Sequence, residues 1–244
     1  GLNASFTQGM ALHGHVAFVA QSGAIVGSVL DWAAARGIGF SHLVSLGDMA
    51  DVDFGDMLDY LANDTNTHAV VLYIEGVTQA RKFVSAARAA ARLKPVVAIK
   101  AGRAPQGARA AASHTGALAG MDQVYDAAFR RTGILRVGDL DEVFDALETL
   151  ARRPKITGDN LVILTNGGGI GVLATDALID DGGRLADLSA NAIADLNTVL
   201  PPTWSHGNPV DIVGDANGPR YAAALRVLQA APGVDAILAL HCPT

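Results

Sequence analysis

Short apolar runs alternate with helix-forming patterns along this 244-residue chain, and the alternation limits the folds that it can adopt. In the first part, runs of strand length are residues 15–20, 42–47, 69–76, 94–102 and 134–137. Helical patterns there are residues 24–37, 53–64, 78–93, 122–133 and 139–153. We expect Thr78 to cap the helix that it begins. Strands and helices in this order predict an α/β fold with a doubly wound parallel sheet.

The polar segment at 154–160 ("PKITGDN") interrupts the pattern, which then begins again. Beyond it, expected strands are 161–166 and 234–242, and expected helices are 169–183, 189–201 and 219–233. We therefore predict two domains, residues 1–152 and 153–244. Because the chain ends directly after a strand that a covering helix usually follows, we expect a fragment of a longer polypeptide with an incomplete second domain.

Composition argues against several classes of protein. The net charge of −6 disfavours a nucleic acid or an anionic membrane as partner. No apolar run approaches the roughly 18–20 residues that span a bilayer, and the first ten residues lack the pattern of a signal peptide. Cys242 is the one cysteine, so no internal disulfide can form. We expect a cytoplasmic protein without a membrane span.

Two similar segments connect a strand to a helix, "FVAQSGAIVG" at 18–27 and "ILTNGGGIGV" at 163–172. Each runs from apolar residues through one amide side chain to small residues, which leaves backbone N–H groups open at a helix N-terminus. We interpret Ser22 as an N-cap beside an anion site. Ser22 as a hydrolase nucleophile is disfavoured, because Ala20 and Ala24 stand where that motif requires glycine. The glycines of the second segment also fit a tight turn that packs helix on strand.

Glu75 ends the apolar run "AVVLYIEG", where a carboxylate would lie at the carboxyl edge of a parallel sheet. Open α/β sheets bind ligands at that edge. Ser22, Glu75 and the segment after Lys100 all leave the ends of neighbouring strands, so we expect them to meet there. The alternative is a turn residue that pairs with Arg81.

His114 lies in "AASHTGALAG", among residues too small to pack an imidazole firmly. A neutral imidazole is a competent nucleophile near neutral pH, and small neighbours would let the segment move. A phosphoryl group on His114 would need compensating charge, which two converging helix ends supply better than one. His13 and His15, two residues apart, could bind a metal but more often belong to a loop, and His206 and His241 have no partner at ligand spacing. We therefore expect no metal site.

The segments "YIEGV", "KPVVAIKAGR" and "SHTGALAG" together resemble the nucleoside-diphosphate-forming acyl-CoA synthetases, a superfamily that includes succinyl-CoA synthetase. The ADP-forming acetate branch is the more similar one, also through "QSGA" and the run "TNGGG…LATDAL…GNPVDIVGDA". The resemblance extends over nearly the whole chain. It implies that both domains are flavodoxin-like.

The resemblance also implies a mechanism, in which His114 is phosphorylated and Glu75 orients its imidazole. The helix N-termini at Ser22, Gly23 and at Asn166, Gly167, Gly168, Gly169 would hold the phosphoryl group. CoA and ATP or ADP with Mg²⁺ would bind mainly on CoA-binding and ATP-grasp domains or subunits, and the substrate would be a small carboxylic acid or acyl phosphate.

We also expect an oligomer. The alternative is an acyl-CoA-sensing regulatory module of a protein lysine acetyltransferase, a group that often lacks the histidine, so His114 favours the ligase.

Overall fold

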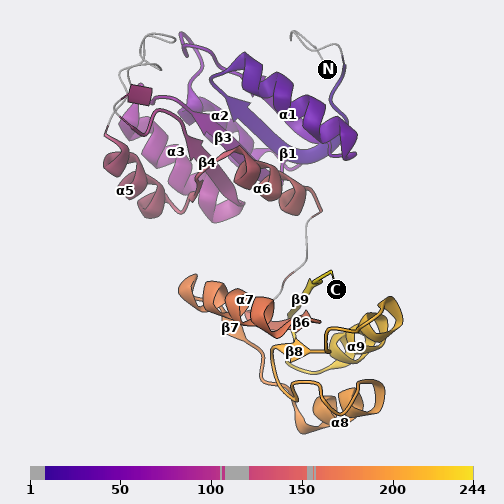
Figure 1. Cartoon of the computed structure of the whole chain (residues 1–244). Helices are drawn as coiled ribbons and strands as arrows, with labels where there is room; N and C mark the ends of the chain where they lie inside the picture. The colour runs from indigo at the N-terminus through magenta and orange to yellow at the C-terminus, as the bar shows by residue number, and fades with distance from the viewer. Residues whose placement is uncertain (1–8, 105, 108–120, 153–155, 157, 244) are drawn as a thin grey trace. The chain divides into compact units, whose positions relative to one another are not determined.

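The computed structural model describes residues 9–104, 106–107, 121–152, 156 and 158–243. The chain divides into two compact units, Gly1–Pro154 and Lys155–Thr244. Each unit contains a parallel sheet with helices packed against it (Figure 1). Among the described residues, no helix combines the length and the apolar character needed to cross a membrane.

Unit 1 is a doubly wound sheet. Its strands, within the described residues, are β1 (His13–Ala20), β2 (Phe40–Ser45), β3 (Ala69–Ile74), β4 (Val96–Lys100) and β5 (Leu135–Val137). Its helices there are α1 (Gly23–Ala35), α2 (Phe54–Asn63), α3 (Ala80–Leu93), α5 (Asp122–Thr132) and α6 (Leu140–Arg152). The strands pair in parallel in the order β2-β1-β3-β4-β5, which is the order of flavodoxin-like folds. The predicted fold is confirmed.

Both faces of this sheet are buried, and successive strand residues alternate between two apolar layers. Ala17 and Val19 of β1 pack with α2, α3 and α5 on one face. Phe18 and Ala20 pack with α1 and α6 on the other face. Since each strand is covered on both sides, the sequence shows unbroken apolar runs instead of apolar–polar alternation.

Unit 2 is built around β6 (Asn160–Thr165). Its other strands are β7 (Arg184–Leu185), β8 (Val210–Asp211) and β9 (Ala236–Leu240), and its helices are α7 (Gly168–Asp180), α8 (Ala190–Val199) and α9 (Gly218–Ala230). β7, β8 and β9 each pair with β6 in parallel. The carbonyls of Leu161 and Thr165 accept hydrogen bonds from Ala186 and Ile212, so β7 and β8 follow one another along the same side of β6.

A side chain bridges the gap between those two short strands. The Asn208 side-chain oxygen accepts from the Ile163 amide at 3.0 Å, and its Nδ2 donates to the carbonyls of Leu161 and Ala186 at 2.8 and 3.0 Å. This amide therefore replaces the backbone partner that a continuous strand would supply. β7 and β8, of two residues each, were not predicted, because so short an element has no measurable periodicity.

The expected Thr78 cap was wrong. Helix α3 begins at Ala80, with Gln79 at the N-cap and no side-chain hydrogen bond there. The Val77 amide donates to the Tyr125 hydroxyl at 3.1 Å, which holds the chain against α5 before the helix begins. The residues before α3 are thus held by a contact with a residue 48 positions away, and Thr78 does not cap the helix.

Phe129 joins α5 to the sheet, and its replacement tests the first apolar layer. The side chain is fully buried and packs edge-to-face on Phe83 at 6.3 Å between ring centroids. Phe129→Ala should destabilise unit 1 by about 3–5 kcal/mol through lost burial and the cavity it leaves. Urea unfolding followed by Trp32 fluorescence, in a Trp204→Phe background, measures this change. Tyr60→Ala, at a side chain that is 58% exposed, should change the stability of unit 1 far less.

Candidate functional site

Two of the predicted residues lie at the carboxyl edge of the sheet in unit 1, together with Lys100, the strand end after which the third predicted segment begins. Ser22 follows β1, Glu75 follows β3, and Lys100 ends β4. β3 pairs with β1 on one side and with β4 on the other, so these positions leave neighbouring strands at the same edge. This is the edge where open parallel sheets place their ligands.

Ser22 caps helix α1. Its backbone is extended, and its hydroxyl oxygen accepts from the Ile25 amide at 3.4 Å. Gly23 and Ala24 are exposed, so first-turn N–H groups, which have no acceptor within a helix, stand at the surface. Among the described residues, a Cβ at Gly23 would meet only the Ser45 hydroxyl, at 3.7 Å, so these residues leave room for an anion to approach the backbone. The N-cap reading of Ser22 agrees with this geometry.

Gln21 links the α1 turn to Glu75, a connection that the sequence analysis missed. Its buried side-chain oxygen accepts from the backbone amides of Glu75 at 2.7 Å and Gly76 at 2.8 Å. The backbone N–H of Gln21 donates to the Tyr73 carbonyl at 3.2 Å. Gln21 therefore fixes the backbone of Glu75 relative to the helix N-terminus. The only signal for it was an amide directly after a buried strand.

Glu75 is 7% exposed, which is unusual for a carboxylate. Its Oε2 is buried and makes no hydrogen bond to any residue that the structure describes. No ion pair with Arg81 forms among these residues, so the alternative of a turn pair finds no support. A buried carboxylate oxygen normally accepts a hydrogen bond, and this atom therefore lacks a donor within the described part of the chain.

Lys100 brings a buried cation to the same edge, and no sequence pattern predicted a role for it. It is 2% exposed, donates to the Ala101 carbonyl, and its Nζ lies 4.7 Å from the centre of the Tyr125 ring. Burial is the largest effect on the Lys100 ammonium and lowers its pKa. The Asp122 and Glu75 carboxylates oppose this shift in pKa, and the Arg136 guanidinium adds to it. Burial, with the Glu75 carboxylate as a second cause, raises the pKa of Tyr73. The edge thus places a buried carboxylate, Glu75, and a buried ammonium, Lys100, at the ends of neighbouring strands.

Unit 2 repeats the same amide contact. The Asn166 side-chain oxygen accepts from the Cys242 amide at 2.7 Å, and its Nδ2 donates to the Cys242 carbonyl at 2.9 Å. Ala20 pairs with Tyr73, and Thr165 pairs with Leu240. Gln21 directly follows Ala20, and its side chain binds the backbone amide of Glu75, two residues beyond Tyr73. Asn166 directly follows Thr165, and its side chain binds the backbone amide of Cys242, two residues beyond Leu240. Asn166 therefore matches Gln21, and Cys242 matches Glu75.

The N-terminus of α7 is more crowded than that of α1. A Cβ at Gly167 would lie 2.7 Å from the Cys242 sulfur, and one at Gly168 would lie 3.0 Å from an Asp211 carboxylate oxygen. Side chains pack closely against Gly167 and Gly168, which agrees with the alternative of a tight turn that packs helix on strand. Around Gly169, no atom of the described part of the chain would lie within 4 Å of an added Cβ, so these residues leave the helix end open there. With the Asn166 side chain used inside the fold, an anion could reach this turn only through backbone N–H groups.

His114 lies outside the residues that the structure describes. The convergence of the helix ends at Ser22 and Asn166 also stays a prediction. Over the described ranges, no group of three or more histidine, cysteine or acidic side chains is arranged to hold a metal ion.

Comparison with known families matches both units. Residues 13–150 match the succinyl-CoA ligase-like flavodoxin domain, and residues 161–242 match the ligase-CoA domain. The first match extends from the first residue of β1 into the last turn of α6, and so includes all five strands described for unit 1.

Individual relatives are similar over the whole chain. The alpha subunit of acetate–CoA ligase [ADP-forming] I from Pyrococcus furiosus is 44% identical over 100% of this chain and 52% of its own length. The 4-hydroxybutyrate–CoA ligase [ADP-forming] of Nitrosopumilus maritimus is 37% identical over 100% of this chain and 35% of its own.

A solved structure is similar as well. The dinucleotide forming acetyl-coenzyme A synthetase 1 of Ca. Korarchaeum cryptofilum, in complex with phosphate and ADP, matches with a TM-score of 0.90 at 39% identity, over 100% of this chain and 53% of that one. The chain spans about half the length of this structure and of the Pyrococcus relative.

The paired amide contacts predict separate effects in the two units. Gln21→Ala leaves two buried N–H groups without their acceptor, and each such group costs about 1–3 kcal/mol. Trp32 fluorescence in a Trp204→Phe background should report a loss of about 2 kcal/mol or more in unit 1. Asn166→Ala, followed by Trp204 in a Trp32→Phe background, should destabilise unit 2. Each variant is the control for the other. If one variant lowered the stability of both units equally, the Gln21 and Asn166 contacts would not act separately.

The buried ammonium predicts a dependence of stability on pH. Because the folded pKa of Lys100 is lowered, the unfolded chain binds more protons above that pKa, so stability rises with pH in this interval. Lys100→Met removes the titrating group and the burial cost. The variant should be more stable than the wild type near pH 7, by a margin that narrows toward about pH 10. Urea unfolding at several pH values measures the margin; a constant margin would contradict the lowered pKa.

Proposed function

The chain belongs to the nucleoside-diphosphate-forming acyl-CoA synthetase superfamily, and on this premise we propose that it supplies the phosphohistidine relay of an ADP-forming ligase for a small carboxylic acid. His114 is the proposed carrier of the phosphoryl group, and Glu75 orients its imidazole. The Ser22–Gly23 turn holds the phosphoryl group while it is on the histidine. The turn from Asn166 through Gly167 and Gly168 to Gly169 is proposed as the second helix end.

The observation that carries this proposal is the lone acceptor at Glu75. Its buried Oε2 lacks a donor within the described residues, and Gln21 holds the backbone of Glu75 in place beside the α1 turn. An imidazole N–H is a donor suited to such an oxygen. A carboxylate that accepts this bond fixes the tautomer, so that the other ring nitrogen carries the lone pair and acts as nucleophile.

The proposed steps need only positioning and charge compensation. In the direction of ATP synthesis, the free ring nitrogen of His114 attacks the phosphorus of an acyl phosphate. The bond between phosphorus and the acyl oxygen breaks, and the carboxylate leaves with its electron pair. A terminal oxygen of ADP then attacks the same phosphorus, the P–N bond breaks, and the neutral imidazole is restored. Exposed N–H groups at the start of α1 offset the negative charge between the two steps.

CoA and ATP or ADP with Mg²⁺ are the proposed co-substrates, bound mainly by CoA-binding and ATP-grasp domains or subunits. The relatives in Pyrococcus furiosus and Nitrosopumilus maritimus are named for two different small acids, acetate and 4-hydroxybutyrate. We propose the same class of acid for this chain. The first relative is named as an alpha subunit, which supports an assembly with partner subunits.

The regulatory alternative is the weaker one. The relatives reported above are named as ligases or synthetases, and two of the names include ADP formation. A module that only senses acyl-CoA would have no use for a nucleophile at His114. It would also need no carboxylate held ready at Glu75.

Phosphate labelling tests the relay. The chain, combined with its CoA-binding and ATP-grasp partners and incubated with Mg²⁺ and γ-labelled ATP, should acquire an acid-labile, alkali-stable phosphoryl group. His114→Ala should abolish both the label and CoA-thioester formation, with little loss of stability. Glu75→Gln keeps the size of the side chain but weakens the orientation of the imidazole, so labelling should slow without losing its final level.

Two sets of variants control this experiment. Ser113→Ala and Thr115→Ala remove the hydroxyls beside the histidine, and His13→Ala removes an unrelated imidazole; all three should label normally. A full label in His114→Ala would refute the relay, as would a label on Ser113 or Thr115. A complete wild-type assembly that binds acyl-CoA but takes up no label would favour the regulatory alternative.

A further inference from the structure

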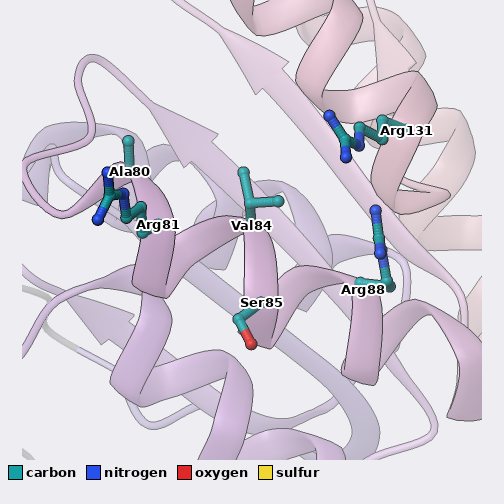
Figure 2. Close-up of a pocket in the computed structure, with 6 residues that line it drawn as sticks. All are labelled: Ala80, Arg81, Val84, Ser85, Arg88 and Arg131. Carbon is teal, nitrogen blue, oxygen red and sulfur yellow. The ribbon is translucent and has the colours of Figure 1, made fainter.

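A basic groove lies on the outer surface of α3 and α5. Its lining residues are Ala80, Arg81, Val84, Ser85, Arg88 and Arg131, and its volume is about 490 Å³. Figure 2 shows the Arg131 side chain reaching from α5 toward Arg88 of α3, while Arg81 lies at the other end of the groove. Since α3 follows β3 and Glu75, the groove begins near the carboxyl edge of the sheet and extends away from it along the helix.

The charges in this groove are uncompensated. Within the described residues, no carboxylate forms an ion pair with Arg81, Arg88 or Arg131, whereas Arg130, Arg136, Arg152 and Arg220 each pair with an acid. All three groove arginines are exposed, on a chain whose net charge is −6. Like charges that converge on one groove repel each other, and an anion between them removes the repulsion.

The packing beneath the groove keeps the two helices in register. Phe83 of α3 and Phe129 of α5 are buried and contact edge-to-face at 6.3 Å between ring centroids. Ala87 and Ala90 of α3 lie in the same apolar layer. Arg88 and Arg131 therefore project from rigid backbones, and their convergence is set by the core.

We propose that this groove binds the phosphate groups of a phosphorylated small molecule. Two guanidinium groups balance a doubly charged phosphate, whereas a carboxylate would neutralise only one of them, and the planar fork of arginine matches phosphate oxygens. Arg81 lies seven residues before Arg88, about 10 Å along the helix, where it would meet a second anionic group of the same ligand. The Val84 and Ser85 side chains between them present an apolar contact and a hydroxyl. A nucleotide and CoA both carry this chemistry, and the site does not depend on the His114 relay.

Direct binding measurements test the groove. ADP, CoA and inorganic phosphate are titrated separately into the full chain by calorimetry, at low and at high salt. At least one of ADP and CoA should bind saturably, with an affinity that falls as salt rises, and the one that binds identifies the source of the phosphate. Arg88→Ala with Arg131→Ala should weaken that binding at least about tenfold, since two charge-assisted contacts are lost.

The matched control is Arg130→Ala with Arg152→Ala. It removes the same charge from exposed arginines of unit 1 that pair with acids outside the groove, and it should bind as the wild type does. His114→Ala should also bind normally, so a failure of the relay leaves this result intact. Unchanged affinity in the Arg88, Arg131 double variant would overturn the proposal, as would the absence of saturable binding by both organic ligands. Equal affinity for inorganic phosphate and both organic ligands would overturn it too, because the groove would then hold an adventitious ion only.

Discussion

Both faces of the sheet in unit 1 are buried, because each parallel connection returns through a helix that covers one face before the next strand begins. The apolar residues of β1 alternate between two layers, one with α2, α3 and α5 and one with α1 and α6. A parallel sheet built in this way gathers the carboxyl ends of its strands at one edge. Polar groups that follow the strands are then neighbours in space, although Gln21 and Glu75 are 54 positions apart in sequence.

The candidate site depends on the side-chain amide of Gln21, which holds the backbone of Glu75 at this edge. Beyond the last residue of a parallel pair, backbone N–H groups lose the ladder that would satisfy them. Gln21 supplies their acceptor in unit 1, and Asn166 supplies it in unit 2 at the matching position. In both units a side-chain amide oxygen thus accepts a hydrogen bond from a backbone N–H just beyond the strand pair. They differ in what the held residue carries, a carboxylate at Glu75 and a thiol at Cys242.

The surroundings of the two turns also differ in charge and in space. At α1, Gly23 is exposed, and the residues that the structure describes leave room around it. At α7, an Asp211 carboxylate oxygen lies 3.0 Å from where a Gly168 side chain would begin, and a negative group there disfavours an approaching anion. The turn of unit 1 is therefore the better anion site within a single unit. A role for the second turn rests on its open end at Gly169.

The order of strands and helices was largely determined by the sequence, because periodicity and apolar composition are local properties that act over a few turns of chain. Ser22 as an N-cap and Glu75 at the sheet edge followed from the same reasoning. The tertiary structure alone decided the features that depend on distant residues. These were the side-chain amide contacts of Gln21 and Asn166 and the start of α3 at Ala80. They also include the burial of Lys100 against the Tyr125 ring and the approach of Arg131 to Arg88. Each joins groups far apart in the chain, where no local pattern carries information about which side chains will face one another.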